Sequence, residues 1–169
     1  MTPMEQRKCQ TDNEKVLDEL LKASRILADE TYQVPPQIMW VDNSTIATLG
    51  NFSASTGKAK SRKTFNVSAI VAASLGNKQV LKYKACLPEG KRKILYIDTE
   101  QSRYHCHGVM RRILRLAGMQ QDVNAANLVF YGLREYHPTM RLQLIERALE
   151  QEQGCGLVII DGIRDLMLD

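Results

Sequence analysis

Two short apolar runs constrain the fold of this chain more than any other feature. Ile94-Leu95-Tyr96-Ile97 and Leu157-Val158-Ile159-Ile160 contain no charged residue, and an aspartate follows each of them. A strand with one face in water alternates polar and apolar residues, so a continuous apolar run predicts a strand that is buried on both faces. Because helical segments lie between the expected strands, the sequence predicts an α/β fold with a mostly parallel sheet and helices on both of its faces.

The expected elements alternate along the chain from about residue 50. We expect helices over residues 63–75, 104–117 and 139–151, and strands over residues 51–56, 93–97, 128–131 and 157–160. Residues 80–87 are expected to pair with residues 93–97 as a hairpin around the turn Pro88-Glu89-Gly90. Residues 37–49 are expected to form an edge strand or a second hairpin.

The first 34 residues form a separate part of the predicted organisation. Residues 1–32 are polar and charged, with leucine and isoleucine at helical spacing: Leu17, Leu20, Leu21, Ile26 and Leu27. Pro35-Pro36 then ends the helical pattern. We therefore expect an N-terminal helical extension over residues 1–34, which packs on the main domain or on a neighbouring subunit, and a domain over residues 35–169.

Composition excludes several classes of protein. Of the 169 residues, 44% are hydrophobic and 25% are charged, as in a soluble domain with a core of its own. The apolar runs are too short to cross a bilayer, and the first residues carry no apolar signal-peptide core. The four cysteines are scattered, with no spacing typical of a disulfide framework or a zinc site: Cys9, Cys86, Cys106 and Cys155. The sequence therefore indicates a cytoplasmic protein without a membrane partner.

Charge and metal-ligand residues give weaker signals. The net charge is +4, and basic residues cluster at positions 58–63, 82–84 and 91–93. Such clusters bind phosphate groups or form a solvated positive surface, and both interpretations stay open. The run His105-Cys106-His107 looks like a metal site, but residues two apart on a helix point to different faces, so we reject that interpretation.

The strongest functional motif is a basic octapeptide before the first expected helix of the domain. It consists of Gly57, Lys58, Ala59, Lys60, Ser61, Arg62, Lys63 and Thr64. The phosphate-binding loop pattern is G-x-x-x-x-G-K-[S/T] between a strand and a helix, and here the first glycine, the lysine and the threonine stand at the right spacing. Arg62 replaces the second glycine. We expect Arg62 to keep an ordinary backbone angle with its side chain turned outward.

Each position of this loop has a chemical reason. Backbone N–H groups of the loop and of the helix start supply fixed partial positive charge for a triphosphate. Lys63 would place its ammonium between the β- and γ-phosphates, and the Thr64 hydroxyl would bind Mg²⁺, a hard ion that prefers oxygen. Gly57 permits the sharp turn. The alternative is a basic loop without a ligand.

Acidic residues follow both buried strands. The carboxyl ends of parallel strands face the crevice where open α/β sheets bind ligands. Glu100 is placed to activate a water molecule for attack on the γ-phosphate, and Asp161 to reach Mg²⁺ through water. Asp98 is the other acidic residue of its motif, Ile97-Asp98-Thr99-Glu100, and it has an alternative role as a strand-end cap for the next helix. The predicted ligands are therefore ATP and Mg²⁺.

At these residues the chain resembles the RecA-like P-loop ATPases, in the branch that includes the RepA-type plasmid helicases. The octapeptide also looks like the phosphate-binding loop of ATPases carried by plasmids and conjugative transposons. The resemblance covers residues 45–169 and does not extend to residues 1–32. It implies ATP hydrolysis coupled to DNA unwinding, replication or mobilization of a mobile element. Its implied partners are single-stranded DNA and neighbouring copies of the chain, one of which completes the site.

The sequence departs from the family pattern at two places. One is Arg62. The other is the end of the chain, eight residues after Asp161, where a RecA-like core has further strands. We therefore expect a C-terminally incomplete core with an uncovered sheet edge. Two alternatives stay open: a non-hydrolysing nucleotide-binding assembly module, and a P-loop kinase. The kinase is less favoured because about fifty residues precede the loop, and because Arg111, Arg112 and Arg115 lie on a helix rather than in a lid.

Overall fold

The computed structural model describes residues 3–58 and 62–167, with side chains from residue 13 onward. The chain divides into two units, residues 1–34 and 35–169. The first unit contains one helix, α1 (Pro3–Ala23). Its apolar side chains are exposed, with Val16, Leu17, Leu20 and Leu21 between 53% and 74% accessible to solvent. Within its described residues this unit therefore has no core of its own.

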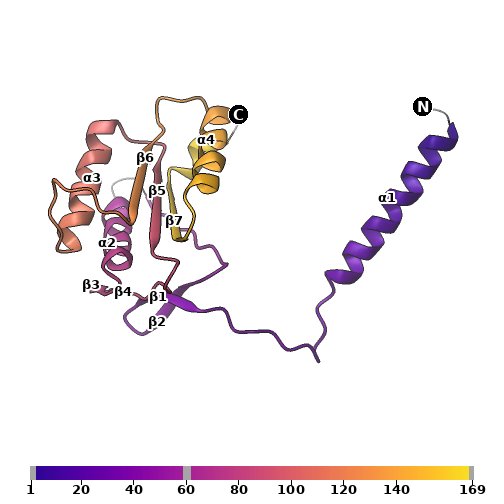
Figure 1. The fold of residues 1–169 in the computed structure, drawn as a ribbon, viewed down its shortest axis with the longest axis horizontal. Helices are drawn as coiled ribbons and strands as arrows, with labels where there is room; N and C mark the ends of the chain where they lie inside the picture. The colour runs from indigo at the N-terminus through magenta and orange to yellow at the C-terminus, as the bar shows by residue number, and fades with distance from the viewer. Residues whose placement is uncertain (1–2, 59–61, 168–169) are drawn as a thin grey trace. The chain divides into compact units, whose positions relative to one another are not determined.

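A three-stranded parallel sheet forms the centre of the second unit (Figure 1). Its strands are β5 (Lys93–Asp98), β6 (Leu128–Gly132) and β7 (Cys155–Asp161), in the order β6-β5-β7. In this register Asp98, the last residue of β5, stands opposite both Gly132 and Asp161. The carboxyl ends of the three strands therefore meet at one edge of the sheet.

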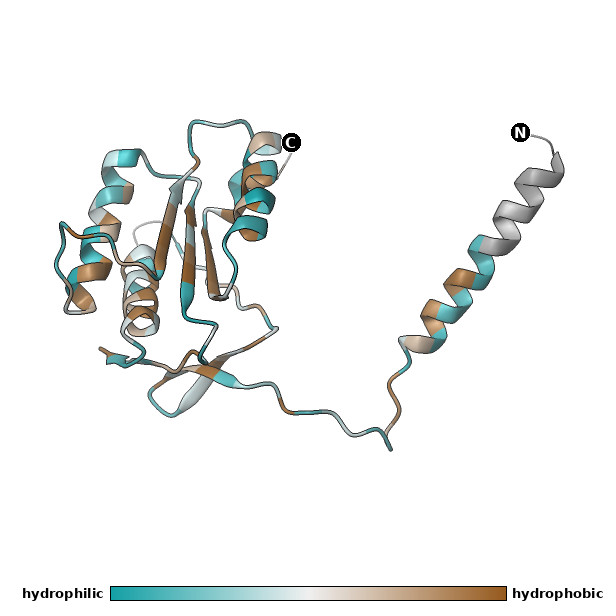
Figure 2. Cartoon of the chain, viewed as in Figure 1, coloured by the Kyte–Doolittle hydropathy of each residue, from teal (hydrophilic) through white to brown (hydrophobic). Residues whose placement is uncertain are grey.

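Helices cover both faces of this sheet, as the sequence predicts. Helices α2 (Lys63–Gly76) and α3 (Arg103–Leu116) lie on one face, and α4 (Pro138–Gln151) lies on the other (Figure 1). Ile94 and Tyr96 of β5 pack into the core on the α2 and α3 side. Leu95 and Ile97 pack on the α4 side. Figure 2 shows the three parallel strands as the most hydrophobic elements of the unit.

A second, antiparallel sheet adds to the predicted architecture. Its four strands are β1 (Gln37–Val41), β2 (Ser44–Thr48), β3 (Gln79–Val80) and β4 (Tyr83–Ala85), in the order β2-β1-β4-β3. The predicted α/β fold with a parallel sheet is therefore confirmed in part: the described chain has a three-stranded parallel sheet and, beside it, this four-stranded antiparallel sheet.

The hairpin expected between residues 80–87 and 93–97 is wrong. Strand β4 pairs with β1 and β3, whereas β5 pairs with β6 and β7. The apolar sequence of β5 makes it the central strand of the parallel sheet. Both of its sides are then occupied, so it has no edge left for a hairpin partner.

The strand expected at residues 51–56 does not form. Residues 51–58 are neither helix nor strand, and the Phe52 side chain is 96% exposed. Four of the six residues of the expected strand are asparagine, serine or threonine, so the segment has little apolar area whose burial would hold it in a sheet. The phosphate-binding loop is therefore not preceded by a strand, which is a further departure from the motif.

The helices of the second unit start and end within about one residue of their predicted positions, and a short 3₁₀ helix, η1 (Ile163–Leu166), follows β7. Strand β7 pairs only with β5 among the described strands, and its Val158 is 39% exposed, so the prediction of burial on both faces holds for β5 and is wrong for β7. Over residues 3–58 and 62–167, no helix combines the length and the hydropathy that crossing a membrane requires.

Candidate functional site

The candidate site lies at the carboxyl edge of the parallel sheet, where the segments after β5 and β7 are tied together. Thr99 donates its backbone N–H to the Asp161 carbonyl over 3.0 Å and its hydroxyl to the Gly162 carbonyl over 2.7 Å. Gly162 has a φ of 98°, and a Cβ there would lie 2.3 Å from the Thr99 Oγ1. Only glycine fits this position, because both the backbone angle and the close approach exclude a side chain.

Asp98 shapes the turn that carries Glu100. Its side chain is fully buried, and its Oδ1 accepts the backbone N–H groups of Glu100 and Gln101 over 3.0 and 2.8 Å. Its Oδ2 accepts the Gln101 side-chain amide over 2.6 Å. Both oxygens are thus occupied, so Asp98 acts as the strand-end cap that we considered as its alternative role.

Asp161 is held by a buried tyrosine. The hydroxyl of Tyr96 donates to the Asp161 Oδ2 over 3.0 Å, and the Tyr96 ring stacks on Phe130 at a centroid distance of 4.3 Å. Burial is the main cause that raises the pKa of Asp161 above its ordinary value, and the Tyr96 hydrogen bond opposes it. This hydrogen bond fixes one carboxylate oxygen of Asp161 from inside the core.

The start of α2 faces this carboxylate. Lys63 is the first residue of α2, and its ammonium donates to the Gly57 carbonyl over 3.1 Å, which brings the ends of the octapeptide together. After the larger effects of burial, Tyr96 and Asp98, the Thr64 hydroxyl and the Lys63 ammonium lower the pKa of Asp161. Lys63 and Thr64 therefore act on Asp161, although 96 residues lie between Thr64 and Asp161 in the sequence.

Glu100 stands at the exposed side of the same group. Burial raises the pKa of Glu100 above its ordinary value, and the carboxylates of Asp161 and Asp165 raise it further, while the Lys63 ammonium lowers it. A carboxylate with a raised pKa that remains accessible to water suits general-base chemistry. The structure thus brings together Lys63, Thr64, Glu100 and Asp161 from three separate segments.

The loop before α2 differs from its sequence prediction. Arg62 has a φ of 61°, so it adopts the left-handed conformation that the glycine of the motif takes without strain, and our expectation of an ordinary backbone angle is wrong. Its carbonyl accepts the backbone N–H groups of Phe65 and Asn66, which makes Arg62 the N-cap of α2. The predicted loop residues Ala59, Lys60 and Ser61 lie outside the described residues. Lys58 and Arg62 are exposed.

The donor groups fit magnesium better than a metal held by protein side chains alone. In the described part of the chain, no group of three or more His, Cys, Asp or Glu side chains could hold a metal ion. Mg²⁺ characteristically uses one or two protein oxygens and completes its shell with phosphate and water. The Thr64 hydroxyl and the Asp161 carboxylate are hard oxygen donors of that kind.

Sequence reasoning missed three residues that organise this edge. Tyr96 was counted only as part of an apolar run, although the hydroxyl of a buried tyrosine needs a partner, and this was the signal that could have identified it. Asp165 lies in η1, and its backbone carbonyl accepts Nη1 of Arg141 over 2.7 Å. The same guanidinium donates to the Leu133 and Arg134 carbonyls, so Arg141 ties η1 to the start of α4.

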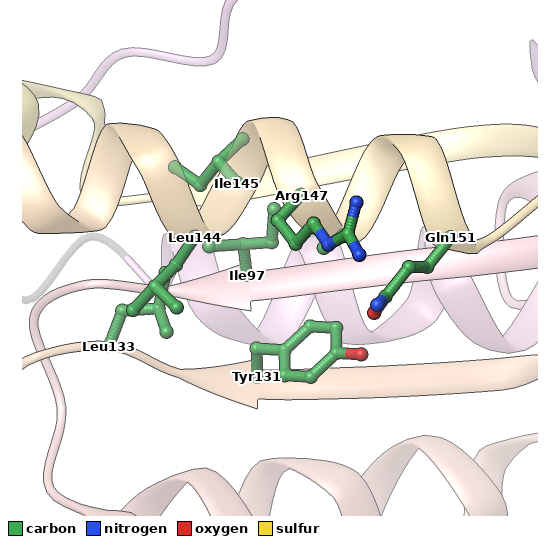
Figure 3. Close-up of a pocket in the computed structure, with 8 residues that line it drawn as sticks. Ile97, Tyr131, Leu133, Leu144, Ile145, Arg147 and Gln151 are labelled. Carbon is green, nitrogen blue, oxygen red and sulfur yellow. The ribbon is translucent and has the colours of Figure 1, made fainter.

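A separate cavity of about 110 Å³ lies on the α4 face of the sheet (Figure 3). Its walls are mainly apolar, with Ile97, Leu133 and Leu144 among them, and its polar groups come from Tyr131, Arg147 and Gln151. None of the four residues grouped at the sheet edge lines it, and α2, which carries Lys63 and Thr64, packs on the opposite face. We therefore do not place the candidate chemistry in this cavity.

The chain matches no protein-family model, no curated protein and no solved structure. A functional argument therefore depends on the grouped residues themselves, which are an ammonium, a hydroxyl and two carboxylates at the junction of α2 with the carboxyl edge of a parallel sheet.

Proposed function

We propose that this protein is a RecA-like P-loop ATPase that binds ATP with Mg²⁺ and hydrolyses it. One observation carries the proposal: the Lys63 ammonium at the start of α2 lowers the pKa of both Asp161 and Glu100, and the Thr64 hydroxyl lowers that of Asp161, and these are the two carboxylates predicted for metal binding and for water activation. The sequence motif predicts this association between residues far apart in the chain. A basic loop on a solvated surface would not require it.

The binding step uses the start of α2. The first N–H groups of a helix lack intrahelical partners and point along the positive end of the helix dipole, where phosphate oxygens are stabilised. In this proposal the Lys63 ammonium exchanges the Gly57 carbonyl for the β- and γ-phosphates of ATP. Thr64 and Asp161 would hold Mg²⁺, whose charge would offset that of the phosphate oxygens.

The hydrolytic step uses Glu100. Its carboxylate accepts a proton from a water molecule whose oxygen forms a bond to the γ-phosphorus. The bond between the γ-phosphorus and the bridging oxygen breaks, and ADP leaves with the electron pair. The Lys63 ammonium stabilises the charge that develops on the phosphate oxygens.

We further propose that hydrolysis is coupled to work on single-stranded DNA, in unwinding, replication or mobilization of a mobile element. Outside the phosphate-binding loop, the basic clusters at positions 82–84 and 91–93 support a polyanionic partner. The resemblance to ring-forming ATPases supports an assembly in which a neighbouring copy completes the site. The scattered cysteines support a cytoplasmic location.

A second candidate function is nucleotide binding without hydrolysis, in an assembly module. Two observations favour it: the left-handed conformation of Arg62, and the position of residues 51–58 outside any strand. Both features hold the loop less rigidly than the glycine and the preceding strand of the usual motif would. Phosphate release distinguishes the two functions, because only the ATPase produces it.

The test uses Mg²⁺-dependent thermal stabilisation by ATP, followed by phosphate release. The wild type should gain stability with ATP, by about 2.7 kcal/mol when the ligand is at a hundred times its Kd. Lys63→Ala should lose this gain, whereas the control Lys91→Ala should keep it. Glu100→Gln should bind ATP and release no phosphate. If ATP stabilised Lys63→Ala as much as the wild type, the proposal would be contradicted.

A further inference from the structure

Helix α3 carries a concentration of positive charge that the candidate ATP site does not use. Residues 101–121 contain four arginines and two histidines, and no aspartate or glutamate. Arg103, Arg111 and Arg115 are exposed, and Arg112 is half-buried. The ion pairs of the described residues, Lys93–Glu152 and Arg147–Glu150, include none of these arginines. The charge of this helix is therefore presented to solvent.

Four of the exposed residues of α3 form one stripe. Tyr104, Gly108, Arg111 and Arg115 follow the spacing i, i+4, i+7, i+11, which places them in line along a single helix face. Tyr104 is 83% exposed at the start of this line. The opposite face of the helix is apolar and buried, and includes Cys106, Val109, Ile113 and Leu114.

Gly108 in the middle of this stripe has no structural explanation. A Cβ at Gly108 would meet nothing within 4 Å, and its φ lies outside the left-handed region. Glycine inside a helix is destabilising relative to alanine, so packing and backbone geometry both favour a larger residue. Because Gly108 has no side chain, the helix backbone is accessible between Tyr104 and Arg111. Such an opening allows a ligand to approach the backbone closely.

We propose that this face of α3 binds single-stranded nucleic acid, with a base stacked on Tyr104 and successive phosphates at Arg111 and Arg115. Arg111 and Arg115 are about 6 Å apart along the helix axis, so each can contact a different phosphate of one strand. An aromatic platform next to basic groups is the combination that binds single strands without base specificity. This inference assigns a binding surface to the DNA partner of the proposed function. It rests on the proposed function only for the choice of nucleic acid as the partner.

The chemistry of the stripe favours nucleic acid over an anionic membrane. A helix that lies on a lipid surface inserts an apolar face between the headgroups. The apolar face of α3 is buried in the core, and its exposed stripe has no aliphatic side chain. An exposed tyrosine beside an uncovered stretch of backbone instead matches the flat face of a base.

The experiment measures fluorescence anisotropy of a fluorescein-labelled twenty-nucleotide oligothymidine over a range of salt concentrations, without ATP. Arg111→Ala with Arg115→Ala should weaken binding and reduce the slope of log Kd against log salt by about 1.4, the value for two lost phosphate contacts on a single strand. Arg25→Ala with Arg147→Ala removes the same charge elsewhere and should leave the slope unchanged. Tyr104→Ala should weaken binding at every salt concentration, and Tyr104→Phe should restore it.

Two further variants separate this inference from the ATPase proposal. Lys63→Ala should lose ATP and keep the oligonucleotide. Gly108→Leu should fold and lose the oligonucleotide, because a side chain there fits the structure but blocks the approach. The inference is overturned if the wild type does not bind the oligonucleotide. It is also overturned if the Arg25 and Arg147 double variant weakens binding as much as the Arg111 and Arg115 double variant does, or if the latter weakens binding only to phosphatidylserine vesicles. A chain that binds no ATP but shows the α3 pattern would contradict the ATPase proposal alone.

Discussion

The two halves of the candidate ATP site are built in different ways. The acidic half, at the ends of β5 and β7, consists of residues fixed by strand register, by buried hydrogen bonds and by Gly162. The basic half joins α2 through an exposed segment, residues 51–58, that belongs to no strand. The acidic half therefore has a geometry determined by the core, whereas the geometry of the basic half depends on local backbone conformation and on the Lys63 to Gly57 hydrogen bond.

This difference indicates that the basic half of the site gains the most order when a ligand binds. A site in which one half is rigid and the other is weakly held gains order when a ligand contacts both halves, and the ordering reduces the affinity that the contacts alone would give. We therefore expect substitutions in the acidic half to act on the stability of the fold, and substitutions in the basic half to act first on nucleotide affinity.

The largest effect is expected at Gly162. Gly162→Ala should lower the free energy of unfolding by about 3 kcal/mol, because it combines a left-handed backbone with a Cβ 2.3 Å from Thr99 Oγ1. Gly90→Ala is the matched control, since Gly90 has a φ of 78° but open space around a Cβ, and should cost about 1–2 kcal/mol. Urea unfolding measures both. Equal losses would show that the contact with Thr99 is unimportant.

A smaller effect is expected at Tyr96. Tyr96→Phe keeps the ring that stacks on Phe130 and removes the hydroxyl that donates to Asp161, which should cost about 1–3 kcal/mol in urea unfolding. Tyr131→Phe, on the neighbouring strand β6, removes a hydroxyl that is only half-buried and should cost less.

Binding measurements test the role of the same hydroxyl at the site. In Tyr96→Phe, more Mg²⁺ should be needed for ATP binding, because the Asp161 carboxylate is no longer fixed. If Tyr96→Phe is destabilised but needs no more Mg²⁺ than the wild type, then Tyr96 supports the fold and has no part in positioning Asp161.

The same contrast explains which features the sequence could predict. The apolar runs predict the parallel strands β5 and β7, of which β5 is buried on both faces, so the parallel sheet, its flanking helices and the acidic residues at its edge follow from the sequence pattern. Residues 51–56 carry no such pattern: their strand was expected because small and β-branched residues could suit a tightly packed central strand. The pairing of β4 with β1 depends on long-range contacts that periodicity does not encode. Predicting the hydrogen bond from Tyr96 to Asp161 requires the register between β5 and β7, which the sequence does not determine.

The third prediction concerns the basic half, at Arg62. Arg62→Gly removes a side chain from a residue with a φ of 61°, so it should raise the free energy of unfolding by about 1 kcal/mol, the cost of the left-handed conformation less the added freedom of glycine in the unfolded chain. It should also tighten ATP binding, because the loop then has the glycine of the phosphate-binding pattern.

Asn77, at the other end of α2, gives the matched control. It is also left-handed, with a φ of 47°, but its side chain accepts the Leu87 backbone N–H and donates to the Leu87 carbonyl over 3.3 Å. Asn77→Gly should therefore destabilise the protein, although the backbone strain relieved is of the same kind. Thermal unfolding and ATP titration of the two variants decide the matter: if Arg62→Gly lowers stability as Asn77→Gly does, then the Arg62 side chain makes contacts that hold the loop, and the basic half of the site is as firmly built as the acidic half.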